Sequence, residues 1–283
     1  MKKLLVFLLF VFTMQFTYGQ QFHVASYNVR YANPTDEQRG NGWSRRCPVI
    51  CDQIAYESFD LIGMQEVLKT QFDDLSDRLS QDYGCFGVGR NDGKMSGEYA
   101  PIFYKKDRFI LLDSGCFWLS ATPDKPSVGW DAKYPRICVW VQLRDRSTGN
   151  TLYFLNTHFD HKSATARRNS AELIVARLKK YGADDLATFV TGDLNVAYTN
   201  AAMAPLTGYL TGARESFSPM DQTPTFHNNG SSAAFIDHIL YRNIDAPQSY
   251  RVLTDCYGVQ KDGKDYYLSD HYPVTAVFSY MKP

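Results

Sequence analysis

The sequence has no excess of charge of either sign. Its 283 residues include 30 lysine and arginine residues and 30 aspartate and glutamate residues. Without Lys2 and Lys3, which belong to the leader predicted below, the count is 28 against 30, a net charge of −2. Proteins that bind long nucleic acids through phosphate contacts usually carry a basic excess or a basic stripe. The balance therefore argues against a strong binder of duplex DNA.

The sequence also lacks features that would divide it into parts. It contains no internal repeat, no low-complexity tract and no Pro/Gly/Ser-rich linker. Its length and its 44% hydrophobic content favour one large globular domain or two small ones. None of its six cysteines forms a CxxC pair, so cysteine spacing gives no support for a zinc site. Cys47 and Cys51 are expected one helical turn apart, and we interpret most of the cysteines as ordinary buried residues.

The only long apolar run, at the N-terminus, is too short to span a bilayer as a helix. Two lysines precede the apolar residues 4–12, and small residues occupy the −3 and −1 positions before a cleavage site after Gly19. This pattern predicts a signal peptide over residues 1–19 and a mature domain over residues 20–283. An uncleaved anchor is the alternative. No cysteine adjoins the cleavage site, which argues against a lipoprotein. We expect a secreted or periplasmic monomer with no transmembrane segment after cleavage.

Hydrophobic periodicity predicts strands and helices that alternate only in part. Helices are expected over residues 44–57, from residue 70 onward, and over residues 163–181, with an irregular stretch over residues 120–134. The predicted strands are residues 22–29, 60–66, 83–88, 100–104, 109–119, 137–143, 152–156, 186–191, 234–241, 250–254 and 273–278. Because many strands follow one another directly, pure βαβ winding does not account for them. The pattern predicts an α/β fold of two mixed sheets packed face to face with helices outside.

Polar residues gather where the predicted strands begin or end. The two most informative segments are Thr-Gly-Asp-Leu-Asn at residues 191–195 and Ser-Asp-His-Tyr-Pro at residues 269–273. Together they bring two carboxylates, an amide and an imidazole to strand ends. These groups can hold a hard cation, activate water and stabilise negative charge on a phosphoryl group. Four further segments have the same placement: residues 27–30, 65–66, 156–161 and 236–238.

In their identity and order, these six segments resemble the endonuclease/exonuclease/phosphatase superfamily. That group includes pancreatic deoxyribonuclease, exonuclease III, the abasic-site endonucleases, the sphingomyelinases, the inositol-polyphosphate 5-phosphatases and the deadenylases. Each motif alone is weak, but the full set in family order covers nearly the whole mature chain. The resemblance implies a four-layer α/β/β/α sandwich of two mixed sheets. It also implies hydrolysis of a phosphoester with a divalent cation, usually Mg²⁺, for which Mn²⁺ could substitute.

The resemblance implies three residues at the metal. Glu66 matches the metal-ligating glutamate, Asn28 the asparagine beside the metal, and Asp270 a second nearby carboxylate. A hard cation takes carboxylate oxygens and retains several waters. The alternatives from the residues alone are a surface glutamate at a helix start for Glu66, a turn residue for Asn28 and a cap for Asp270.

Five further residues match the family's catalytic positions. His271 resembles the histidine at the scissile phosphate and Asp237 its carboxylate partner, which would fix the tautomer of the ring. Asp193 resembles the residue that orients or deprotonates the attacking water. Asn195 would donate to a phosphate oxygen, and His158 would stabilise or protonate the leaving oxygen. A structural His–Asp pair is the alternative for His271 and Asp237.

Four residues are candidates for substrate binding. Abasic-site nucleases carry an acidic residue two positions after the first asparagine, whereas this chain carries Arg30, which cannot ligate a cation but can bind a phosphate. The chain is closer to a secreted bacterial branch that also has the Trp-x-x-Arg motif of residues 43–46. Arg136 and Arg167 are candidate phosphate partners, with ordinary ion pairs as the alternative. Tyr99 lies near the position of a phosphate-contacting tyrosine in relatives.

The sequence therefore predicts a secreted, divalent-metal-dependent phosphoesterase that works by in-line attack of water. Phosphodiester and phosphomonoester substrates both remain open. The balanced charge favours a small nucleotide-like, sugar-phosphate or lipid head-group substrate over long DNA. The alternatives are a nuclease acting on DNA or RNA, a binding protein on a retired enzyme scaffold, and a hydrolase of another bond, such as a glycosidase that uses two carboxylates.

Overall fold

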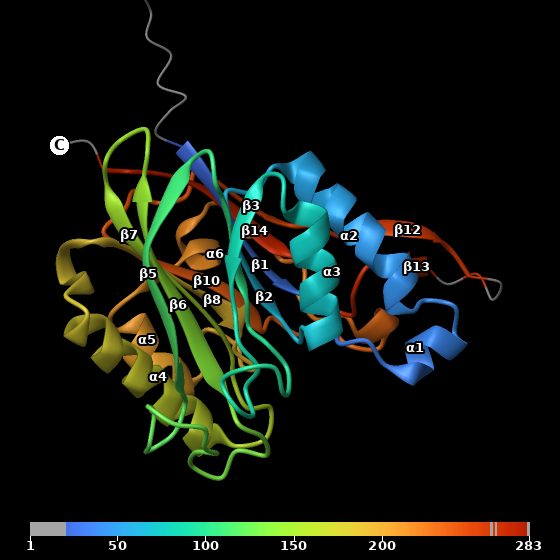
Figure 1. Ribbon diagram of the computed structural model, residues 1–283, viewed down its shortest axis with the longest axis horizontal. Helices are drawn as coiled ribbons and strands as arrows, with labels where there is room; N and C mark the ends of the chain where they lie inside the picture. Colours follow the sequence, from blue (N-terminus) through green and yellow to red (C-terminus); the bar gives the residue numbers. More distant parts are fainter. Residues whose placement is uncertain (1–20, 261–262, 264, 282–283) are drawn as a thin grey trace, which may run out of the picture.

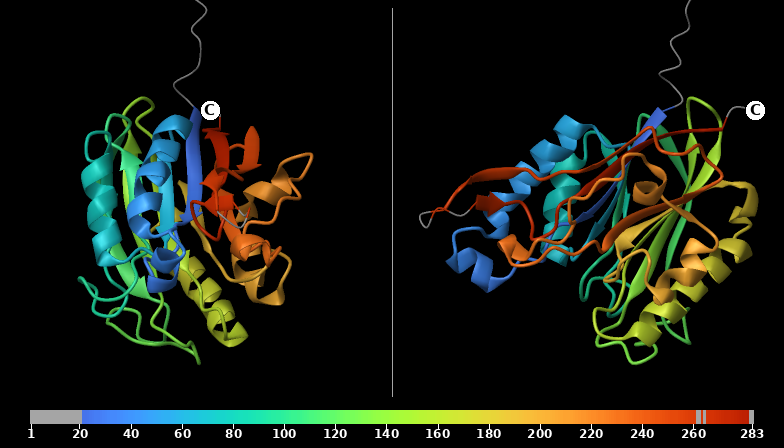
Figure 2. Two further views of the ribbon diagram at one scale, coloured as in Figure 1. Left: turned by 90° about the vertical axis from the view of Figure 1, so that its right-hand side faces the viewer. Right: turned by 180° about the vertical axis from the view of Figure 1, so that it is seen from behind.

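The computed structural model describes residues 21–260, 263 and 265–281. The signal peptide predicted over residues 1–19 lies outside this range. As predicted, the fold is a four-layer α/β/β/α sandwich in which two six-stranded sheets pack face to face between helices (Figures 1 and 2). Within the described ranges we find no helix with the length and hydrophobicity of a membrane span.

The first sheet carries the N-terminal and C-terminal strands of the domain. Its strand order is β11-β14-β1-β2-β4-β3, and among the described strands of this sheet β1 and β2 alone pair in parallel. Its strands are β1 (Gln21–Asn28), β2 (Leu61–Gln65), β3 (Tyr83–Phe86), β4 (Ile102–Lys105), β11 (Ser249–Val252) and β14 (Val274–Ser279). Two helices cover its outer face: α2 (Trp43–Glu57) and α3 (Lys69–Leu79).

The second sheet is built from the middle of the chain. Its order is β5-β6-β7-β8-β10-β9, with β7 and β8 parallel. Its strands are β5 (Phe109–Trp118), β6 (Ile137–Asp145), β7 (Thr151–His158), β8 (Ala187–Asp193), β9 (Thr211–Gly212) and β10 (Asp237–Arg242). Its outer face is covered by α4 (Ala164–Lys180), with η3 (Ala201–Met203) and α5 (Ala204–Thr207) beside that helix.

Short elements that periodicity did not predict complete the structure. They are α1 (Pro34–Gln38), α6 (Ala213–Ser216), the turns η2 (Ala183–Asp185) and η4 (Asn228–Gly230), and the hairpin of β12 (Cys256–Val259) and β13 (Asp265–Tyr267). The hairpin extends past α2 toward α1 (Figure 1). It contacts the segment between α1 and α2: Asn41 Nδ2 donates to the Tyr267 carbonyl at 3.0 Å, and the Arg45 guanidinium lies 4.8 Å from the Tyr266 ring centroid.

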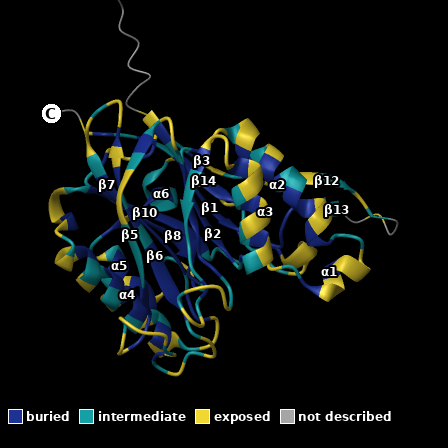
Figure 3. Ribbon diagram, in the orientation of Figure 1, coloured by how far each residue is buried: buried dark blue, intermediate teal, exposed yellow. Residues whose placement is uncertain are grey.

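The core lies in three layers, one between the sheets and one beneath each set of helices. Between the sheets, the Phe189 ring packs edge-on against Phe22 and Phe278, with centroids 5.6 and 5.0 Å apart. Apolar side chains anchor the helices, because Ile50 and Ile54 of α2 are fully buried, as is Ile174 of α4. Figure 3 shows the central strands as the most buried part of the molecule.

At one end of the sandwich the layer between the sheets becomes polar. Asn156 of β7 donates to the carbonyls of Met64 and Pro101 at 2.6 and 3.1 Å, and its Oδ1 accepts from Gln65 Nε2 at 2.7 Å. Gly63 permits this approach, since a Cβ there would lie 2.2 Å from Thr191 Oγ1. These hydrogen bonds fix one sheet against the other next to the strand ends that carry the predicted site residues.

Candidate active site

The register of the second sheet aligns three predicted site residues in a row. In the ladders, His158 of β7 lies opposite Asp193 of β8, and Asp193 lies opposite Asp237 of β10. Directly opposed residues on neighbouring strands project from the same face of a sheet. The row is therefore set by strand pairing alone, although 79 residues separate His158 from Asp237 in the sequence.

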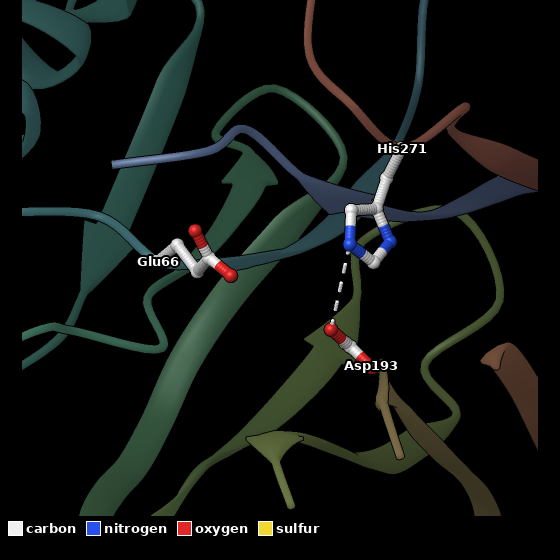
Figure 4. Close-up of side chains that lie close together, drawn as sticks. All are labelled: Glu66, Asp193 and His271. Atoms are coloured by element: carbon white, nitrogen blue, oxygen red, sulfur yellow. Dashed lines mark ion pairs between the residues drawn. The ribbon is translucent and has the colours of Figure 1, made fainter. Parts of the chain in front are cut away.

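The first sheet brings the remaining predicted residues to the same place. Asn28 ends β1, Glu66 follows β2, and Asp270 and His271 precede β14. The buried Asn28 joins the two sheets, because its Nδ2 lies 3.2 Å from Glu66 Oε1 and 3.1 Å from Asp193 Oδ2. Figure 4 shows the side chains of Glu66, Asp193 and His271 converging from three separate segments. Residues far apart in the sequence thus share one centre.

Three residues at this centre adopt left-handed backbone conformations. Arg30, Glu66 and Asn195 have φ values of 54°, 62° and 52°. Such a conformation costs a non-glycine residue about 1–3 kcal/mol and persists only where surrounding contacts impose it. The Glu66 carboxylate accepts from the Tyr31 main-chain N–H at 3.2 Å, and Asn195 Nδ2 donates to the Phe159 carbonyl at 3.0 Å.

His271 is held in a fixed orientation. Its Nδ1 donates to Asp237 Oδ2 at 2.8 Å, which leaves Nε2 facing Asp193 Oδ2 at 3.7 Å. Burial disfavours the charged ring, but the carboxylates of Asp237 and Asp193 outweigh it and raise the pKa of His271 to about 10. At neutral pH the ring is an imidazolium that can donate a charged hydrogen bond from Nε2.

Asp193 and His158 have pKa values displaced in opposite senses. Burial and the charge of Asp237 raise the pKa of Asp193 to about 7, against the opposing effect of His271. Burial and the nearby guanidinium groups of Arg136 and Arg90 lower the pKa of His158 well below its usual range. His158 is therefore neutral, with Nε2 lying 3.4 Å from Asp193 Oδ2. Displaced values of this kind are typical of catalytic sites.

The donor set fits a hard divalent cation. One potential ligand atom from each of Glu66, Asp193 and His271 lies within 4.8 Å of the others. Because His271 Nε2 carries a proton, the ligand that this group offers is a carboxylate, and Mg²⁺ characteristically takes one or two carboxylates together with waters. Burial and the nearby charges of Asp270 and Glu98 raise the pKa of Glu66. A cation at this point would relieve that repulsion.

Arg30 is committed to an ion-pair network. Its guanidinium pairs with Asp36 at 2.6 Å and also with Asp270. It therefore positions Asp270 beside Glu66, and its predicted contact with substrate phosphate stays a prediction.

The arginine of the Trp-x-x-Arg motif supports the loops that carry the site. Arg46 is fully buried and donates to the carbonyls of Val29, Leu268 and Arg30 at 2.6, 2.9 and 3.1 Å. It thereby ties the loop after Asn28 to the loop before Asp270.

The remaining substrate-binding candidates differ in position. Arg136 lines the cavity described below. Tyr99 is buried, its hydroxyl donates to the Lys94 carbonyl at 2.9 Å, and its ring stacks on Phe72. Arg167 donates to the Asp160 carbonyl at 2.9 Å. Arg167 is not among the described residues that line the cavity over the site. Tyr99 lines a small adjoining pocket together with Arg90, Arg136 and His158, so the structure places it beside the site, and its contact with a phosphate stays a prediction.

A cavity of about 250 Å³ opens over this centre. Sequence reasoning missed several of its walls, because Arg90 and Glu98 lie in the irregular loop between β3 and β4 and Phe226 lies in a loop before β10. Glu98 lies 3.9 Å from His158 Nδ1, and the Phe226 ring packs 4.6 Å from His271. No periodicity or motif marks these positions, and only the folded chain brings them to the site.

Two further histidines lie within the polar segments at the strand ends. His161 lines the cavity. His238 instead donates from Nε2 to the Val196 carbonyl at 2.8 Å and is buried.

Comparison with known proteins gives a consistent picture. The model of the Endonuclease/Exonuclease/phosphatase family matches residues 25–271. A Bacteroides thetaiotaomicron protein described as an endonuclease/exonuclease/phosphatase family protein superimposes with a TM-score of 0.85 at 38% identity, over 93% of this chain and 98% of that one. A mannosyl-6-phosphatase of B. thetaiotaomicron VPI-5482 has a TM-score of 0.85 and 38% identity, over 92% of this chain and 100% of that one. A Bacteroides vulgatus endonuclease/exonuclease/phosphatase has a TM-score of 0.82 and 34% identity, over 92% of this chain and 99% of that one.

Proposed function

The chain belongs to the Endonuclease/Exonuclease/phosphatase family, whose members hydrolyse phosphoesters, and from this premise we propose a divalent-metal-dependent phosphoesterase for small phosphorylated substrates. Sugar phosphates are the favoured substrate class. The observation that carries the proposal is the meeting of Asn28, Glu66, Asp193 and His271, from both sheets, within hydrogen-bonding or ion-pairing reach of one another. We further propose that Mg²⁺ is the cation and that the enzyme is secreted or periplasmic.

Two observations support a small substrate. The cavity volume of about 250 Å³ lies below the range typical of drug-sized ligand pockets, which is about 300–1,000 Å³. A relative with 38% identity over nearly its whole length is named a mannosyl-6-phosphatase. The balanced charge of the chain supports the same choice, since a groove for long nucleic acid would need a basic surface.

In the proposed reaction, water attacks phosphorus in line with the leaving oxygen. Asp193 takes the proton of that water at Oδ2, and a carboxylate with a pKa near 7 suits a general base at neutral pH. The Asn195 main-chain N–H donates to Asp193 Oδ1 at 2.9 Å and fixes the carboxylate. The P–O bond to the leaving group then breaks, and neutral His158 donates a hydrogen bond to the departing oxygen. That oxygen takes its proton from solvent water, and Asp193 returns its own proton to solvent.

Charge on the phosphoryl oxygens is met by preorganised donors. His271 donates from Nε2 as an imidazolium, because Asp237 holds its other nitrogen. Glu66 and Asp270, with Asn28 between the sheets, would hold the cation. A bound divalent cation supplies Lewis-acid charge neutralisation at the phosphoryl oxygens. Preorganised groups of this kind usually make the largest contribution to catalysis of acyl and phosphoryl transfer.

A phosphoester panel tests the proposal. Purified mature protein is stripped with EDTA and assayed before and after addition of Mg²⁺ or Mn²⁺. The panel contains p-nitrophenyl phosphate, bis-p-nitrophenyl phosphate, hexose phosphates, nucleotides, oligonucleotides, inositol phosphates and sphingomyelin. We expect hydrolysis of small phosphoesters that depends on added metal. Hydrolysis confined to oligonucleotides would identify a nuclease, and turnover insensitive to EDTA would contradict a metal-dependent site.

A further inference from the structure

Arg136 carries a buried positive charge without a carboxylate partner. It precedes β6 and is only 5% exposed. Its one polar side-chain contact is from Nη2 to His161 Nδ1 at 3.4 Å, while Nε and Nη1 are buried without a hydrogen-bond partner in the described part of the chain. An uncompensated buried charge destabilises a protein by several kcal/mol. The presence of Arg136 at the cavity wall therefore indicates a binding position for an anion that enters the cavity from solvent.

A second guanidinium lies next to the first. Arg90 pairs with Glu98 at 2.6 Å and lies 5.1 Å from the Tyr134 ring centroid, yet its Nε is also buried without a partner. The repulsion is evident at Arg136, where burial and the charge of Arg90 lower the pKa. Glu98 therefore pairs directly with Arg90, whereas Arg136 has only the electrostatic influence of Glu98, Asp193 and Asp160 and no ion-pair partner of its own among the described residues.

We propose that Arg136, supported by Arg90, receives the second negative charge of a phosphomonoester dianion and so makes the enzyme a phosphomonoesterase. The inference rests on the proposed function and deepens it by naming the charge state of the substrate. A phosphodiester carries one charge on its phosphoryl group, and the cation, His271 and Asn195 already meet it. A terminal phosphate carries a charge of about −1.5 to −2 at pH 7, because its second pKa is about 6. The unpaired guanidinium of Arg136 matches that additional charge.

Two aryl substrates with the same leaving group test this inference. In p-nitrophenyl phosphate the phosphoryl group is a dianion, whereas in methyl p-nitrophenyl phosphate it is a monoanion. We expect Arg136→Met to lower kcat/KM for the monoester on the order of 10²-fold. The loss in kcat/KM for the methyl diester should be smaller than this by a factor of about ten or more. Arg136→Lys should recover part of the loss, since it retains the charge without the planar guanidinium. The matched control is Arg144→Met, an exposed arginine on β6.

A binding measurement separates this inference from the proposed reaction. In the presence of Mg²⁺, inorganic phosphate should raise the Tm of the wild type more than dimethyl phosphate does, and Arg136→Met should abolish that difference. The Tm of ligand-free Arg136→Met should equal or exceed that of the wild type, because the substitution removes an unpaired buried charge. A structural role for Arg136 would instead lower it.

The outcomes can be distinguished. Equal losses on both aryl substrates, together with an unchanged difference between the two phosphate ligands, would overturn the role of Arg136 and leave the phosphoesterase intact. No hydrolysis of any phosphoester by the wild type, with an Arg136-dependent response to inorganic phosphate, would overturn the proposed reaction and leave the anion site intact.

Discussion

At the scale of single residues, the account depends on how neighbouring charges set protonation states. His271 is an imidazolium because Asp237 accepts from its Nδ1 at 2.8 Å. Replacing Asp237 with asparagine keeps the shape but removes the charge. We expect the pKa of His271 to fall from about 10 toward its ordinary value. Hydrolysis at pH 8 should then decline on the order of 10²-fold. NMR titration of the His271 ring checks the first effect and kcat the second, and an unchanged titration would contradict the assignment.

A second histidine makes stability depend on pH. His227 Nε2 donates to the Ser269 carbonyl at 3.1 Å, and burial lowers the pKa of His227 to about 4, against the opposing charge of Asp270. The unfolded chain binds a proton below about pH 6.5, whereas the folded ring stays neutral down to about pH 4. The contribution of this ring to the free energy of unfolding is therefore fully present above pH 6.5 and declines as the pH falls toward 4.

His227→Gln tests this linkage, because glutamine retains an N–H donor and does not titrate. Urea unfolding of the wild type and the variant between pH 7 and pH 4 should give a shallower acid-side decline for the variant. Parallel curves would mean that His227 does not contribute to the pH dependence.

Substitution of the buried Arg46 tests whether this residue supports the loops that carry the site. Arg46→Met would leave the carbonyls of Val29, Leu268 and Arg30 without their donor. Each buried group left unsatisfied costs about 1–3 kcal/mol, so we expect a loss of about 3 kcal/mol or more in the free energy of unfolding. Chemical denaturation checks this value. Wild-type stability in the variant would show that water replaces the guanidinium.

At the scale of elements, the close pairing of β7 and β8 positions Asp193, the carboxylate that we propose as the base. A Cβ on Gly192 would lie 2.2 Å from the Thr157 carbonyl oxygen of the neighbouring strand. We expect Gly192→Ala to destabilise the protein by about 1–3 kcal/mol and to lower activity, because Asp193 would move with the strand. Gly258→Ala is the control, since its Cβ would only reach an ordinary contact 3.7 Å from Tyr266. Equal Tm and kcat values for the two variants would contradict this interpretation.

Most elements could be predicted from the sequence, and the misses have a common physical cause. The strand that ends at Asp193, the strand that follows His271 and the long helix α4 have clear apolar patterns, so their bounds could be predicted to within a few residues. The α1 helix and the β12–β13 hairpin are short, and side-chain contacts to neighbouring segments hold them. Periodicity does not detect elements of this length.

The site residues divide in the same way into those that the sequence could predict and those that it could not. Asn28, Glu66, Asp193, Asp237 and His271 lie in motifs at strand ends and could be predicted as a group. Arg90, Glu98 and Phe226 could not, because they lie in loops without a motif. Tyr99 lies beside the site in a pocket with Arg136 and His158, and its hydroxyl donates to the Lys94 carbonyl. Arg167 donates to the Asp160 carbonyl and is not among the described residues that line the cavity.

At the scale of the whole molecule, the sandwich joins two incomplete half-sites. The second sheet contributes the row of His158, Asp193 and Asp237, and the first contributes Asn28 and Glu66 with the loop before β14. The hydrogen bonds of Asn156 across the interface hold the two sheets in register with one another. Neither sheet alone holds both the carboxylates for a cation and the base for water.

The central claim is tested most directly by measuring phosphate release by Glu66→Gln and by the wild type at saturating Mg²⁺. The substitution keeps the size of the side chain and removes one negative charge from the point where the two half-sites meet. The account predicts metal-dependent hydrolysis by the wild type and a loss on the order of 10²–10³-fold in the folded variant. Wild-type turnover by Glu66→Gln would contradict it.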